Sequence, residues 1–219
     1  MLINKIKSFL YKYILFIGKL ILIFTLIRIF EYTYILASFE QETSFDLFFS
    51  KSLNFDILSI LLFSLGLLFP VLILASINYR VSIVFIKIIG LTFVTINLIF
   101  THYFLINSSL ITISIFEFSS TELFNTVFNE LTYNRIVLII TFFSLLFLFA
   151  FILLFNFKEA RVSNKLKFIF LSGYILAVLI ALVNHKYTFK SPKYFKNTYQ
   201  YTLGNSKTVY FLKSCFQNS

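Results

Sequence analysis

Cysteine is almost absent from this chain of 219 residues, because Cys215 is the only one. A single thiol can form neither an intrachain disulfide nor a cluster of metal-binding thiolates. The two histidines, His102 and His185, have no carboxylate or second histidine at metal-binding spacing such as i, i+4. The five glycines are too sparse for a GxxxG packing face or a phosphate-binding loop. We therefore expect no cofactor in this chain and no catalysis by the chain alone.

Charged residues are also scarce, at 13% of the sequence against 59% for hydrophobic residues. A soluble domain of this length could not bury so much apolar surface. Residues 83–107 and 136–157 are almost unbroken apolar runs, and about 20 apolar residues in a helix span the hydrocarbon core of a bilayer. We therefore predict that most of the chain lies in a lipid bilayer and that lipid is its main partner.

The apolar runs predict an all-α fold, a polytopic transmembrane helical bundle of about five spans. The predicted spans are residues 13–37, 56–77, 81–107, 135–157 and 166–184. The first span resembles the start of a signal peptide, but it continues past Ala37 without a small-residue cleavage site, which favours an uncleaved signal anchor. Residues 1–184 would form the transmembrane domain, and residues 185–219 a basic and aromatic tail.

The charges between the spans predict the orientation. Cations lie before the first span, between the second and third spans, and between the fourth and fifth spans. They are Lys5, Lys7, Lys12, Arg80, Lys158, Arg161, Lys165 and Lys167. The alternate loops are acidic. The positive-inside rule then places the N-terminus in the cytoplasm and the tail outside the membrane. The tail alone, with six lysines, would favour the cytoplasm, and a four- or six-span arrangement would reverse its side. The net charge of +10 comes with no nucleic-acid-binding motif, so we expect no nucleic-acid partner.

Arg28 and Glu31 are the most unusual polar residues within a predicted span. Residues three apart share one face of a helix and can form an ion pair. Ionisable groups at this depth are costly and usually face a bundle interior or a wet cavity. They are candidates for contact with a lipid headgroup or substrate near the outer leaflet, or for a structural ion pair. We expect Lys19 and Lys87 to extend towards the cytoplasmic interface.

The loop after the third span contains a capping box, Ser119-Ser120-Thr121-Glu122. In this motif the serine hydroxyl and the glutamate carboxylate each accept a hydrogen bond from the other residue's backbone amide. A short amphipathic helix should follow and lie on the outer membrane surface. The alternative is a lid that only packs over the bundle.

Two segments resemble known proteins. Residues 103–127, YFLINSSLITISIFEFSSTELFNTV, resemble a segment in the membrane domains of bacterial lipoteichoic acid synthase-like sulfatases, which are phosphoglycerol transferases of the alkaline phosphatase superfamily. The matching residues are Tyr103, Phe104, Phe116, Ser119, Glu122, Thr126 and Val127, and the departures from the family pattern are Leu110, Thr112, Ser114 and Phe118. Residues 206–211, SKTVYF, resemble the Asn-Lys-x-x-Tyr-Phe segment that precedes the extracytoplasmic catalytic domain in such proteins.

The resemblance implies a membrane-anchoring module for a sulfatase-like phosphoglycerol transferase. The matched residues from Tyr103 to Thr126 would form an outer-surface loop, and Lys207, Tyr210 and Phe211 would lie beside anionic or lipid-linked substrate headgroups. The catalytic threonine and the divalent metal of the family belong to a later domain, which would be a separate or missing partner of this chain. The alternative is a free-standing integral membrane protein, acting as a transporter subunit or as a scaffold of an envelope complex. An intramembrane enzyme lacks candidate residues.

Overall fold

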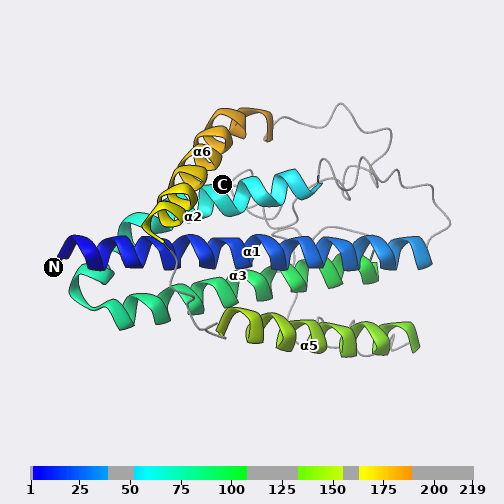
Figure 1. Cartoon of the computed structure of the whole chain (residues 1–219). Helices are drawn as coiled ribbons and strands as arrows, with labels where there is room; N and C mark the ends of the chain where they lie inside the picture. The colour runs from blue at the N-terminus through cyan, green and yellow to red at the C-terminus, as the bar shows by residue number, and fades with distance from the viewer. Residues whose placement is uncertain (1, 39–51, 108–132, 155–162, 189–219) are drawn as a thin grey trace, which may run out of the picture.

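The computed structural model describes residues 2–38, 52–107, 133–154 and 163–188 (Figure 1). These residues form helices and no strands: α1 (Leu2–Ser38), α2 (Asn54–Ile77), α3 (Tyr79–Asn107), α5 (Tyr133–Leu154) and α6 (Asn164–Thr188). All five helices are long and apolar enough to cross a membrane. In lipid every backbone polar group must be bonded internally, which a helix achieves within one segment. The chain is an integral membrane protein, and the predicted five-span helical bundle is confirmed.

Helices α1, α2, α3 and α5 alternate in direction along the chain. The rings of Phe9 and Tyr79 pack with centroids 6.0 Å apart near the beginnings of α1 and α3, and those of Phe30 and His102 pack 5.6 Å apart near their ends, so these two helices are parallel. The start of α2 contacts the second half of α1, and the end of α5 contacts the first half of α3. Helices α2 and α5 therefore run opposite to α1 and α3, as consecutive membrane spans must.

Helix α1 is the centre of the bundle. It packs against each of the other four helices, with α2 and α6 on one side and α3 and α5 on the other in the view of Figure 1. Its buried side chains, including Tyr13, Leu20, Phe24 and Ile27, supply much of the main hydrophobic cluster. Gly90 of α3 permits close contact with α1, because a Cβ atom there would collide with the ring of Phe16.

Asn78 joins α2 to α3 without a loop. Its extended backbone (φ −145°, ψ 107°) ends α2, and its amide still donates to the Leu74 carbonyl at 2.8 Å. Its side-chain Oδ1 accepts hydrogen bonds from the backbone amides of Arg80 and Val81, at 3.0 and 3.3 Å. An asparagine that accepts from the first free amides of a helix is a favourable N-cap. One residue thus ends one span and begins the next.

Two helix ends differ from those predicted by more than three residues. Helix α1 begins at Leu2 instead of residue 13, because Lys5, Lys7 and Lys12 change the polarity of the segment without breaking a helix, and no glycine or proline precedes Gly18. Helix α6 continues to Thr188 instead of residue 184. Pro70 lies inside α2, and the helix continues on both sides of it.

Candidate functional site

The side chains of Arg28, Glu31 and Asp56 form a buried charged cluster between α1 and α2. Arg28 Nη1 lies 2.6 Å from Glu31 Oε2, so the predicted pairing is present, and Arg28 Nε lies 2.5 Å from Asp56 Oδ2. The exposed fractions of the three residues are 3%, 0% and 1%. Charge-assisted hydrogen bonds are the strong ones in proteins, so the cluster ties the two helices together at this level of the bundle.

Local helix geometry explains how one guanidinium reaches two carboxylates. Arg28 and Glu31 are three residues apart on α1 and therefore share a face. Asp56 is in the first turn of α2, where the helix dipole favours a negative charge. The planar guanidinium presents five N–H donors in a fixed fork, which allows one arginine to bond partners in two directions. Asp56 was not predicted, because 28 residues separate it from Arg28 and it seemed only to begin the second span.

One carboxylate oxygen of Asp56 can still accept hydrogen bonds. Its Oδ1 is buried and has no hydrogen-bond partner among the described residues, and the same holds for the hydroxyl of the fully buried Ser52, one turn earlier. A buried polar atom without a partner costs about 1–3 kcal/mol. The cluster combines one guanidinium with two carboxylates, and Oδ1 offers an acceptor to a donor group. This arrangement can clamp α1 to α2 electrostatically and can bind a polar group at Oδ1.

His102 on α3 lies close to this cluster but not within it. Its ring stacks on Phe30, two residues beyond Arg28, and meets Phe142 of α5 edge to face with centroids 5.1 Å apart. Nδ1 donates to the Leu98 carbonyl at 3.0 Å, whereas the buried Nε2 has no partner in the part of the chain that the structure describes. Within that part, no group of three His, Cys, Asp or Glu side chains is placed to hold a metal ion. The packing points to a structural role for this histidine at the junction of α1, α3 and α5.

A second polar region lies at the end of α5. Lys19 Nζ donates to the Ile152 carbonyl at 3.0 Å, and Lys87 Nζ donates to the Leu154 carbonyl at 2.9 Å. The last four carbonyls of a helix have no partner within it, and cations are favourable there. The two lysines were predicted to extend towards the cytoplasmic interface. In the structure they converge on the end of a neighbouring helix.

The residues selected through the family resemblance have different positions. Tyr103 and Phe104 belong to α3 and not to an outer-surface loop, because the apolar run carries the helix on to Asn107. Phe104 is only 2% exposed and packs in a small cluster with Ile35, Leu105 and Leu138. The remaining candidates lie outside the described residues, together with the predicted surface helix: they are Phe116, Ser119, Glu122, Thr126, Lys207, Tyr210 and Phe211.

The two polar regions thus connect helices in different ways. The cluster of Arg28, Glu31 and Asp56 links α1 to α2 through side chains, and the lysines link α1 and α3 to the end of α5 through backbone carbonyls.

Comparison of the chain with protein-family models, with curated proteins and with solved structures finds no match.

Proposed function

We propose that this chain is a membrane module of the bacterial cell envelope that anchors a sulfatase-like phosphoglycerol transferase domain at the outer face of the inner membrane. The observation that carries the proposal is the odd number of apolar helices, five, in the part of the chain that the structure describes. An odd number of crossings brings the two ends of the chain to opposite sides. The cations flanking the spans favour a cytoplasmic N-terminus, so the basic and aromatic tail would emerge outside, where lipid-linked substrates would be within reach.

The packing of α1 suits an anchor. A helix in contact with four others holds the bundle together as one unit, and the buried charged cluster fixes α1 against α2 close to the end from which α1 would leave the outer leaflet. A catalytic domain attached to such a platform would keep a constant height above the membrane. The resemblance of residues 103–127 and 206–211 to the sulfatase-like family is the reason for proposing that the anchored domain is of this kind.

Topology gives the first test. An alkaline phosphatase reporter fused after Ser219 should be active, and a green fluorescent reporter at the same position should be dark, because each works on one side of the membrane only. The matched control places the same reporters between Leu154 and Ser163, where the pattern should be inverted. A fluorescent, phosphatase-inactive fusion after Ser219 would contradict the anchor.

The partner gives the second test. The tagged protein, solubilised in a mild detergent from its native cell, should carry or copurify a metal-dependent sulfatase-like domain, encoded downstream of this sequence or in a neighbouring reading frame. Correct topology without such a reading frame or copurified domain would leave an integral membrane protein of another class.

The charged cluster favours one alternative, a transporter subunit. Ionisable residues within the membrane mark ion or substrate pathways by default, and Asp56 Oδ1 keeps an acceptor free of described partners. Transport by the reconstituted chain should then require Asp56, so that Asp56→Asn abolishes flux while the topology is unchanged. An anchor would tolerate this substitution, because Arg28 and Glu31 still form a neutral pair.

A further inference from the structure

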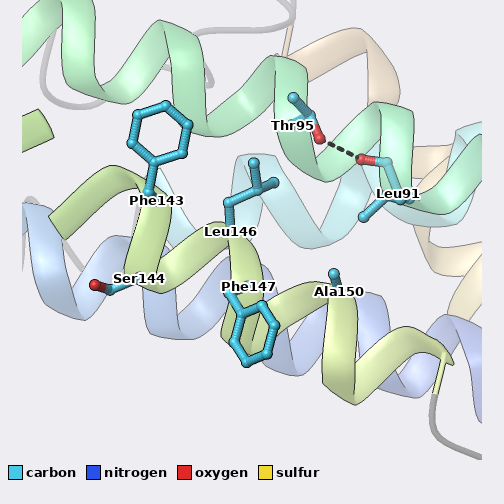
Figure 2. A pocket seen from close by; sticks show the side chains of 7 residues that line it. All are labelled: Leu91, Thr95, Phe143, Ser144, Leu146, Phe147 and Ala150. Carbon is cyan, nitrogen blue, oxygen red and sulfur yellow. Dashed lines mark hydrogen bonds between the residues drawn. The ribbon is translucent and has the colours of Figure 1, made fainter. Parts of the chain in front are cut away.

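A groove of about 720 Å³ lies between α3 and α5 on the outside of the bundle (Figure 2). Leu91 and Thr95 form its α3 side, and the α5 side has a larger share of the lining. The α5 residues are Phe143, Ser144, Leu146, Phe147 and Ala150. This volume is within the usual range for small-molecule sites, about 300–1,000 Å³.

The groove offers almost no hydrogen bond to an occupant. The hydroxyl of Thr95 donates to the Leu91 carbonyl at 2.9 Å, a bond drawn in Figure 2, and the hydroxyl of Ser144 donates to the Ile140 carbonyl at 2.9 Å. Both polar side chains of the lining are therefore satisfied within their own helices. Phe143 and Phe147 are 62% and 77% exposed, so the groove faces the surrounding lipid. An apolar chain is the occupant that these walls suit.

One end of the groove carries positive charge. Lys87 precedes Leu91 by one helical turn, and Leu154 follows Ala150 by one turn, so the Lys87–Leu154 bond lies about 6 Å beyond the groove along both helices. Lys19 reaches the same end of α5 through the Ile152 carbonyl. These two bonds place both ammonium groups at the end of α5, so their positive charge lies beside the groove. An occupant with an apolar chain and an anionic head would match both features.

We propose that the groove between α3 and α5 binds one acyl chain of an anionic phospholipid, whose phosphate lies beside Lys19 and Lys87. The phospholipid would seal the lipid-exposed seam between the two helices, and its headgroup would lie at the end of α5, where that span leaves the membrane. In the proposed orientation this is the cytoplasmic leaflet. The site is independent of any anchored enzyme, since it lies at the opposite end of α5 from the predicted outer surface.

The absence of tryptophan from the sequence allows a direct test. The variant F147W carries a single tryptophan in the groove, and brominated acyl chains quench tryptophan fluorescence on contact. The full-length variant is reconstituted into phosphatidylcholine vesicles in which the bromine is carried either by a small fraction of phosphatidic acid or by the same fraction of phosphatidylcholine. Two lysines beside an anionic head should give phosphatidic acid roughly a tenfold preference at this tryptophan.

Three further variants separate the contributions. Adding K19M and K87M to F147W should reduce the preference to about one, and adding K19R and K87R should restore it, because charge and not the exact side chain is required. Adding A150F should also abolish the preference by filling the groove while both lysines remain. The control F69W places the tryptophan on α2, at a residue 73% exposed with no charged residue within one turn, where the two brominated lipids should quench equally.

Equal quenching of F147W by the two brominated lipids would overturn the proposal. This holds also for weak quenching that is equal for both lipids, which is expected if a protein partner covers the groove. A preference that persisted in K19M/K87M would also overturn it. Because the readout is lipid contact in the intact chain, failure of this site would leave the topology and partner tests of the anchor unaffected.

Discussion

The two polar regions of the bundle differ in the partners that their charged side chains bond. At one level, Arg28 is bonded by two carboxylates, one from its own helix and one from α2. Nearer the beginning of α1, Lys19 and Lys87 bond to the backbone carbonyls at the end of α5. In the first region, oppositely charged side chains bond each other. In the second, the ammonium groups bond backbone carbonyls, which carry a partial negative charge at the C-terminal end of every helix.

This difference predicts unequal sensitivity to substitution. Removing the cation of this cluster leaves two carboxylates buried without their partner, and that penalty is large. Removing a lysine from a helix end leaves a carbonyl that other donors can bond, and only the favourable interaction is lost. Comparing substitutions in the two regions therefore distinguishes charges that stabilise the packing of the bundle from charges that only bond the carbonyls at a helix end.

The largest effect is expected for Arg28→Leu. Two buried carboxylates would lose their shared cation, which typically costs about 3–5 kcal/mol. Equilibrium unfolding of the purified protein in mixed detergent micelles would measure the loss. Arg80→Leu is the matched control, because Arg80 is exposed at the start of α3 and should change stability little.

The triple variant Arg28→Leu/Glu31→Leu/Asp56→Leu should be more stable than Arg28→Leu alone. Apolar replacement of a whole buried ion cluster is often neutral or stabilising. If the triple variant were as unstable as the single one, packing around Arg28, and not its charge, would hold α1 to α2.

The sequence predicted the five described helices and most of their limits because lipid imposes a length and a polarity that are visible as apolar runs. It failed at the beginning of α1, where lysines marked the edge of the predicted membrane span but not the end of the helix. Helix formation depends on backbone propensity, to which lysine is favourable. The limits of a membrane span and of a helix are therefore separate predictions.

The candidate site was only partly predictable for a related reason. The Arg28–Glu31 pair follows from spacing along one helix. Asp56, Lys19 and Lys87 depend on which helices are neighbours, and no periodicity within a helix contains that information. Backbone carbonyls as partners have no sequence signature at all, so the prediction for the two lysines gave a direction towards the cytoplasmic interface but no partner.

A smaller effect is expected for Lys19→Met combined with Lys87→Met. Cations at a helix C-terminus contribute typically about 0.3–1 kcal/mol each, so the double variant should lose about 1 kcal/mol in the same unfolding assay. Hydrogen exchange should accelerate in the last turn of α5 and remain unchanged in α2. Lys165→Met, at an exposed residue of α6, is the control; a loss as large as that of Arg28→Leu would remove the distinction between the two regions.

The smallest effect is expected where three helices meet without any charge. Ser64 Oγ and Tyr174 Oη lie 2.8 Å apart between α2 and α6, while the hydroxyl of Tyr13 on α1 donates to the Ser64 carbonyl. Side-chain hydrogen bonds within membrane bundles contribute on average only about 0.6 kcal/mol. Tyr174→Phe should therefore destabilise the chain by about that amount.

A double-mutant cycle identifies the bond responsible. In a Ser64→Ala background, Tyr174→Phe should cost almost nothing, because the partner hydroxyl is already gone and any remaining loss reports a different contact of the phenol. A cost near that of Arg28→Leu would mean that the neutral contact is as important as the ionic one. The expected order, from cluster to lysines to hydroxyls, follows the charge left without a partner and not the number of hydrogen bonds removed.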